Sequence, residues 1–173
     1  MSAISVFLSR PTSVNPAQQA FCESLSDVLD GEGLQARTLG VTDYPGSAPL
    51  GEVVTLMRQC SGAIALGLRQ LHVKAGTRKE GSANQAEVND LHLPTPWNQI
   101  EAGMAVALDR PLLVAREQGV EGGVFDLGSS DRFIHQVELN DGWLDAKRFR
   151  QPFSIWVDDV KKFDATLSHG PAQ

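Results

Sequence analysis

Short apolar runs, typical of buried strands, alternate with amphipathic segments along the chain. The runs predict five strands, with approximate bounds Ile4–Ser9, Leu34–Leu39, Gly62–Leu68, Leu112–Ala115 and Phe133–Leu139. Apolar residues recur at helical spacing between these runs, and a final helix is predicted over roughly Phe153–Leu167. Because strands and helices alternate and the strands are apolar on both faces, we expect an α/β fold whose parallel sheet is covered on both sides.

The simplest arrangement of five such strands is a flavodoxin-like three-layer sandwich with strand order 2-1-3-4-5. Ligands of such folds bind outside the carboxyl ends of the strands, where the strand order reverses, here between the first and third strands. The segments that reach this edge are Ser9–Pro11, Thr42–Gly46, Arg69 with the loop that follows it, Trp97–Glu101, and Arg116-Glu117. We therefore expect the functional site there.

A polar segment, Arg69–Pro94, separates the third strand from the next helix. It contains lysine, arginine and glutamate together with several Gly, Ser and Asn residues. Connections of this length are unusual in compact domains and are commonly lids, binding loops or partly disordered segments. We interpret the segment as a loop insertion and favour disorder over a lid.

The bulk composition is that of a globular protein. A chain of 173 residues suits one domain, spanning 1–173, with 42% hydrophobic and 21% charged residues. The formal net charge of −6 argues against nucleic acid as a partner. The start of the chain lacks a basic leader, and no apolar run reaches membrane-spanning length, so we expect a cytoplasmic protein without a membrane partner.

Several chemistries lack their characteristic motifs. The sequence has no Gly-x-x-x-x-Gly-Lys-Ser/Thr phosphate loop, no Gly-x-Gly-x-x-Gly after the first strand and no Gly-x-Ser-x-Gly nucleophile elbow. Two histidines, His72 and His92, lie in the long polar segment, but the chain has no paired cysteines and no His-Glu-x-x-His. We therefore predict neither a metal site nor a cofactor.

One carboxylate stands out at the start of the helix that follows the polar segment. Thr95 fits the N-cap and Pro96 the first helical position, and we expect Glu101 on the opening turn of this helix. Apolar residues recur at helical spacing beside it and are expected to face a core: Trp97, Ile100, Met104 and Leu108. Glu101 falls at the predicted crevice, although a glutamate there also complements the helix macrodipole, which is a purely structural interpretation.

A carboxylate in a crevice with arginines nearby suits cleavage of a glycosidic bond to a good leaving group. The reaction passes through an oxocarbenium-like ribosyl centre, which a carboxylate can stabilise or attack. Arg10 or Arg69 can pair with a pyrophosphate, and Trp97 or Tyr44 can stack on a base. Against these roles, Arg10 and Tyr44 also suit ordinary loop positions, and the apolar stripe favours core packing for Trp97.

Three further residues complete the candidate substrate-binding set: Ser9, Asp43 and Asn98. Ser9 ends the first strand, and Asp43 lies in the loop after the second strand. A turn aspartate that bonds its own backbone is the favoured interpretation of Asp43.

The segment Trp97-Asn98-Gln99-Ile100-Glu101 resembles the Trp-Cys-x-x-Glu segment of Toll/interleukin-receptor (TIR) domains, with Asn98 at the position of the cysteine. Val6–Ser9 is similar to the opening strand of that family, Thr42–Gly46 occupies the place of its BB loop, and Ala63–Leu66 resembles its third strand. The resemblance implies that Glu101 is catalytic, as in the members that consume NAD. NAD is then a substrate and not a cofactor.

The stretch Ile100–Pro111 also resembles the nucleophile helix and following turn of nucleoside 2-deoxyribosyltransferases, which share this architecture. Those enzymes carry an aspartate six residues before the glutamate, where this chain has Thr95. The Trp97 match therefore favours the TIR-like interpretation.

The TIR resemblance implies an enzyme that releases nicotinamide and hydrolyses or cyclises the ADP-ribosyl product. It further implies a homo-oligomer or an assembly with a partner signalling protein, in bacterial antiviral defence. Two alternatives stay open, because a fold alone does not fix activity: a deoxyribosyltransferase-like enzyme, and a non-catalytic module that binds a nucleotide or a protein.

Overall fold

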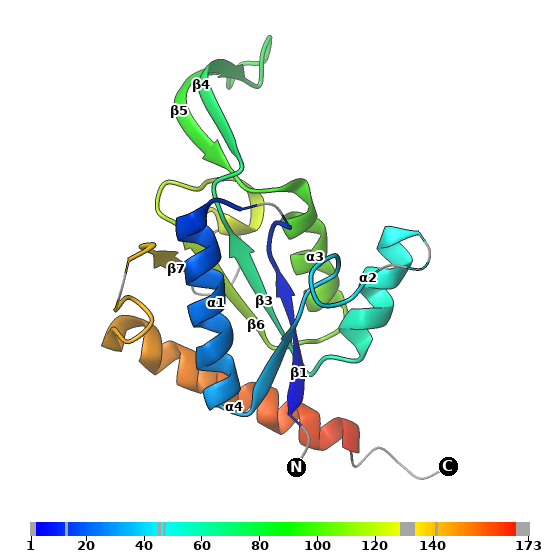
Figure 1. The fold of residues 1–173 in the computed structure, drawn as a ribbon. Coiled ribbons are helices and arrows are strands. Elements are labelled where there is room, and N and C mark those ends of the chain that lie inside the picture. Colours follow the sequence, from blue (N-terminus) through cyan, green and yellow to red (C-terminus); the bar gives the residue numbers. More distant parts are fainter. Residues whose placement is uncertain are drawn as a thin grey trace.

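Five parallel strands form the central sheet of the computed structural model, which describes residues 3–12, 14–44, 46, 48–128, 134–140 and 142–168 (Figure 1). The strands are β1 (Ile4–Ser9), β2 (Leu34–Arg37), β3 (Gly62–Gly67), β6 (Leu112–Glu117) and β7 (Ile134–Val137). Their order across the sheet is β2-β1-β3-β6-β7. Counted among these five strands alone, this is the order 2-1-3-4-5, which confirms the predicted flavodoxin-like fold. Phe133, the expected start of the last strand, lies outside the described residues.

Helices cover both faces of the sheet and create two cores. On one face, α1 (Pro16–Gly31) and α4 (Lys147–Ser168) pack against the side chains that β1, β3 and β6 direct to that face. On the other face, α2 (Pro49–Arg58) and α3 (Pro96–Ala107) pack with the short 3-10 helix η1 (Gly123–Phe125). None of the helices in the described part of the chain is both long enough and apolar enough to cross a membrane.

The last helix begins earlier than predicted. It starts at Lys147 and continues through Pro152, whereas the sequence suggested a start at Phe153. The added turn buries Phe149, whose ring stacks on that of Phe153 with centroids 4.9 Å apart. Packing of this aromatic pair outweighs the helix-breaking tendency of the proline.

Helix α1 is tied to the carboxyl edge of the sheet by its cap. Asn15 and Gln18 form a capping box, with Gln18 N donating to Asn15 Oδ1 over 2.9 Å. The buried Gln18 amide also donates to the backbone oxygen of Arg69 and, over 2.9 Å, to Glu117 Oε2. One side chain thus links α1 to the ends of β3 and β6.

The polar segment between β3 and α3 is an antiparallel hairpin, so the expectation of a partly disordered loop over Arg69–Pro94 is wrong. Strands β4 (Leu71–Arg78) and β5 (Ala86–Leu93) form a separate two-stranded sheet, which meets the rest of the domain at a single bridge between His92 and Val120 among the described residues. The hairpin projects from the end of the domain at which the arrow of β3 points (Figure 1). Most of its side chains are exposed, which explains the polar composition.

Candidate functional site

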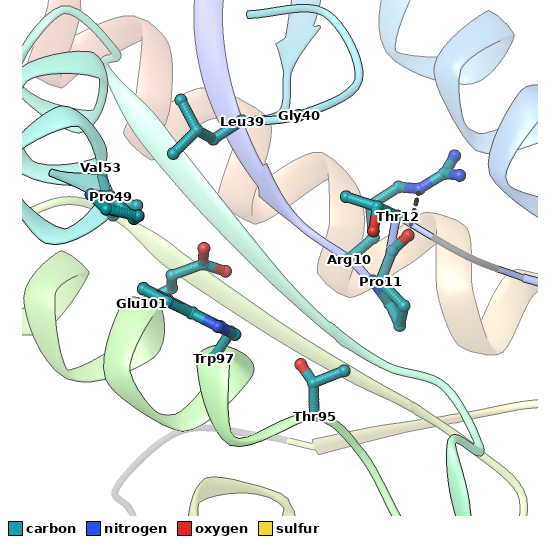
Figure 2. A pocket seen from close by; sticks show the side chains of 10 residues that line it. All are labelled: Arg10, Pro11, Thr12, Leu39, Gly40, Pro49, Val53, Thr95, Trp97 and Glu101. Atoms are coloured by element: carbon teal, nitrogen blue, oxygen red, sulfur yellow. Dashed lines mark hydrogen bonds between the residues drawn. The ribbon is translucent and has the colours of Figure 1, made fainter. Parts of the chain in front are cut away.

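A cavity of about 240 Å³ opens beside the carboxyl end of β1 (Figure 2). Four segments line it: Arg10, Pro11 and Thr12 after β1, Leu39 and Gly40 after β2, Pro49 and Val53 of α2, and Thr95, Trp97 and Glu101 of α3. This is the edge at which ligands of doubly wound sheets bind. The volume is below the roughly 300–1,000 Å³ of pockets that enclose a drug-sized ligand, so the cavity holds only part of a dinucleotide.

Glu101 extends from the second turn of α3, with its carboxylate directed into the space that Leu39 and Pro49 border (Figure 2). The first turn of α3 contains no acidic residue. Because the effect of the macrodipole falls off within one turn, dipole compensation does not explain the position of Glu101. This corrects the expectation that Glu101 stands on the opening turn.

The environment of Glu101 disfavours its charged form. Burial raises the pKa of its carboxyl group to about 7, and a hydrogen bond from Ser9 acts in the opposite direction. A carboxyl group with such a pKa exchanges protons near neutral pH. Perturbed groups of this kind in a cavity are characteristic of functional sites.

Asn98 is a buried residue that holds the start of α3 against the sheet. Its amide nitrogen donates to the Ser9 hydroxyl over 2.9 Å and to the backbone oxygens of Ser9 and Leu66. Its amide oxygen accepts a hydrogen bond from the hydroxyl of Thr95, the N-cap residue. Asn98 therefore positions Ser9, which bonds Glu101, and is not among the residues that line the cavity; its role in binding substrate stays a prediction.

Trp97 lines the cavity, and its expected place in a core is wrong. Trp97 and Ile100 are both 41% exposed, whereas the buried residues of α3 are Asn98, Ala102 and Ala105. Small alanines allow α3 to approach the sheet closely, so Trp97 and Ile100 turn outward, whereas Met104 and Leu108 stay partly buried against the core. Trp97 stands one turn before Glu101 on the same face of the helix, beside it in Figure 2.

Arg10 borders the cavity, but its guanidinium points away from Glu101 (Figure 2). Within the part of the chain that the structure describes, it donates to the backbone oxygen of Pro11 and to Gln19 Oε1. Both partners are neutral oxygens.

Three other predicted binding residues lie away from the cavity lining. Asp43 forms an ion pair with Arg37 and accepts a hydrogen bond from the Thr42 hydroxyl, and Arg37 lowers the pKa of its carboxyl group. Tyr44 is 78% exposed. Arg69 donates to the backbone oxygen of Gln118 and belongs to another surface hollow. The structure thus joins Ser9, Arg10, Trp97 and Glu101 in one site and leaves Asp43, Tyr44 and Arg69 outside it.

The cavity also contains residues that the sequence analysis did not assign to it. Thr12, Leu39, Gly40, Pro49 and Val53 form the wall opposite α3. Gly40 has a φ of +80°, and a Cβ added there would lie 3.1 Å from Thr12 Cγ2. The turn residue Gly40 was the available signal, because a glycine after a strand end often marks tight backbone packing.

No protein-family model matches the chain, and a search of curated protein sequences also gave no match.

Proposed function

We propose that this protein cleaves the N-glycosidic bond of a ribosyl nucleotide, with NAD as the substrate to test first and Glu101 as the catalytic carboxylate. The observation that carries the proposal is the position of Glu101. Its carboxyl group lies in a cavity at the carboxyl edge of the sheet, has a pKa of about 7 and neighbours an exposed tryptophan. The resemblance of Trp97–Glu101 to the TIR segment supports the same reaction class.

In this reaction the bond between the ribose C1′ and the nicotinamide nitrogen breaks, and both bonding electrons leave with the nitrogen. Nicotinamide departs as a neutral molecule, and positive charge develops on C1′ and the ring oxygen. The Glu101 carboxylate stabilises this charge or attacks C1′. Water then adds at C1′ and loses a proton to give ADP-ribose, or an adenine nitrogen adds to give a cyclic product. Where Glu101 has bonded to C1′, this addition breaks the bond and the carboxylate leaves with its electron pair.

The raised pKa of Glu101 fits a cationic substrate. Burial disfavours the carboxylate, so without a neighbouring cation the carboxyl group is about half protonated near pH 7. The nicotinamide ring of NAD carries a positive charge, and a cation next to Glu101 favours ionisation. Binding of NAD therefore produces the charged form that the reaction needs.

Two residues at the rim provide the remaining recognition. The exposed face of Trp97 offers a stacking surface for a base. Arg10 can exchange its neutral partners for a pyrophosphate, because a charge-assisted bidentate bond is stronger than bonds to neutral oxygens.

The test is an incubation of the purified protein with NAD at several protein concentrations, with products separated by chromatography. We expect nicotinamide release that is lost in Glu101→Gln and Glu101→Ala. Glu23→Gln is the matched control, since Glu23 is an exposed carboxylate on α1 that accepts a hydrogen bond from Gln19. Turnover that rises more than linearly with concentration would support an active oligomer. Undiminished release by Glu101→Gln would contradict the proposal.

A parallel incubation with a deoxynucleoside and a free base separates the alternatives. Base exchange that depends on Glu101 would identify a deoxyribosyltransferase-like enzyme. The Thr95 hydroxyl, at the position of the transferase aspartate, caps α3 and so argues against that activity. Saturable NAD binding without products at high protein concentration would identify a binding module.

A further inference from the structure

The β4–β5 hairpin brings together three side chains with metal-ligating atoms. His72 and His92 are directly opposite in the antiparallel register. Asp90 lies two residues before His92, and its carboxylate reaches both imidazoles. Within the described parts of the chain, these three form the one group of three or more His, Cys, Asp or Glu residues that could hold a metal ion.

The ligating atoms of this group are close. His72 Nε2 is 2.7 Å from Asp90 Oδ1, and His92 Nε2 is 3.8 Å from the same oxygen. One ligating atom from each residue lies within 4.8 Å of the other two. The imidazole rings are nearly parallel, with centroids 4.4 Å apart. Two imidazoles and a carboxylate thus face one point at the hairpin surface.

The backbone of Asp90 departs from that of a regular strand. Its φ is +54°, in the left-handed region, although it lies within β5. Regular pairs flank it on both sides, Val73 with Leu91 and Ala75 with Asn89. Aspartate tolerates this conformation better than most residues, but it is uncommon inside a strand. Residues with a left-handed backbone conformation are found more often at active sites and ligand-binding positions than elsewhere.

We propose that His72, Asp90 and His92 form a binding site for a divalent transition-metal ion, with Zn²⁺ as the ion that fits best. Two neutral imidazoles and one carboxylate are a common three-ligand set for zinc and leave a fourth tetrahedral position for water or another ligand. The proposal is independent of the function assigned to Glu101. It replaces the sequence-based expectation that His72 and His92 hold no metal.

Small side-chain movements complete the coordination. Zinc bonds of about 2.0–2.1 Å at tetrahedral angles place ligand atoms roughly 3.3 Å apart. The distance from Asp90 to His72 must grow slightly, and the distance from Asp90 to His92 must shrink slightly. The side chains of His72 and Asp90 are 43% and 82% exposed, so both rotate without disturbing a core.

The pairing register of the hairpin brings the two histidines together, although they are far apart in the sequence. His72 and His92 are twenty positions apart in the chain but form a direct cross-strand pair. A bound ion would link β4 to β5 near the base of the hairpin. The backbone N–H of Gln70 also donates to the backbone oxygen of Leu93 there. The ion would therefore hold both strands at the point where they leave the domain.

The test is titration of the full chain, freed of metal with a chelator, with ZnCl₂ by isothermal calorimetry and with CoCl₂ by visible absorption. We expect one equivalent of either ion, with a Co²⁺ spectrum of tetrahedral type. His72→Ala, His92→Ala and Asp90→Asn should each weaken Zn²⁺ binding by at least the roughly 10–100-fold that loss of an outer-shell partner costs. Asp90→Asn tests the charge of the carboxylate alone, because asparagine keeps a hydrogen-bonding oxygen of the same shape but is neutral.

Glu87→Gln is the matched control, since Glu87 is an exposed carboxylate on the same hairpin, opposite Thr77, and is not part of the group. Its binding constant should equal that of the wild type. Circular dichroism in the absence of metal should show all four variants folded, because the hairpin lies outside both cores. The proposal is overturned if the wild type binds no Zn²⁺, or if the His72, His92 and Asp90 variants bind it as tightly as Glu87→Gln.

Discussion

Asn98 Nδ2 donates a 2.9 Å hydrogen bond to the hydroxyl of Ser9. A hydroxyl group has one hydrogen to donate, and because Ser9 accepts from Asn98, its own hydrogen is available to Glu101. The buried amide therefore orients the hydroxyl that bonds the carboxylate. These two hydrogen bonds, from Asn98 to Ser9 and from Ser9 to Glu101, join the end of β1 to α3 beside the cavity.

Removing the hydrogen bond from Ser9 to Glu101 should raise the pKa of Glu101. In Ser9→Ala the carboxylate loses a hydrogen bond that favours its ionised form, while the burial that disfavours that form is unchanged. We expect the pKa to move above about 7, measured by NMR titration of the side-chain carboxyl carbon. Ser26→Ala is the control, since the Ser26 hydroxyl bonds a backbone oxygen within α1. An unchanged or lower pKa in Ser9→Ala would show that the hydroxyl does not act on Glu101.

The pKa of Glu101 also links stability to pH. Folding raises this pKa from an ordinary value near 4.5 to about 7, so the folded protein binds the proton more tightly than the unfolded chain. The stabilisation is complete below pH 4.5 and is lost as the pH rises through about 7.

Glu101→Gln removes this dependence. Relative to the wild type, the variant should gain stability between pH 5 and pH 8, by up to about 3 kcal/mol for a shift of this size. Urea unfolding of both proteins across the pH range measures the difference, and titration of all other groups cancels in the comparison. A difference that does not change with pH would mean that the Glu101 carboxyl is as well solvated in the folded protein as in the unfolded chain.

Strands β1, β3 and β6 could be predicted because each contains a run of consecutive buried residues, which is apolar in sequence. All six residues of β3 are buried, for example, and its predicted bounds differ from the observed ones by one residue. The hairpin was missed because its strands have little burial to reveal them. The alternation of Leu71, Val73 and Ala75 was the available signal, and only the pairing register shows that Leu93 and Leu91 stand opposite the first two.

The position of Trp97 could not be predicted from periodicity alone. The pattern of large apolar residues on α3 indicated one face as the core face, but the face with Asn98, Ala102 and Ala105 is the buried one. The spacing of apolar residues shows which residues share a face of the helix. Close packing against the sheet decides which of these faces is buried. Stacking of a base on Trp97, the other interpretation that the sequence offered, requires the exposed ring that the structure shows.

Close approach of α4 to β3 makes Gly62 intolerant of a side chain. A Cβ at this position would lie 2.4 Å from Val160 Cγ2 and 3.3 Å from Trp156 Cζ2. Val160 is β-branched and buried, so it has little freedom to move. We expect Gly62→Ala to lower the free energy of unfolding by about 1–3 kcal/mol, measured by urea denaturation.

Gly103→Ala is the matched substitution within α3. No atom lies within 4 Å of a Cβ added there, and alanine favours a helix over glycine, so stability should rise by about 0.5–1 kcal/mol. If both substitutions had the same effect, contact with Val160 would not be the cause of the loss at Gly62.

Trp97 should report directly on ligand binding. It is 41% exposed at the cavity rim, whereas Trp143 and Trp156 are 4% and 6% exposed within the core. A base stacked on the Trp97 ring should quench its fluorescence, so addition of NAD to Glu101→Gln, which prevents turnover, should lower the emission in a saturable manner. The same titration of Trp97→Phe in this background should show no quenching, because the two remaining tryptophans are shielded. Quenching that persists without Trp97 would place the bound base elsewhere on the protein and would separate the stacking role of Trp97 from the catalytic role of Glu101.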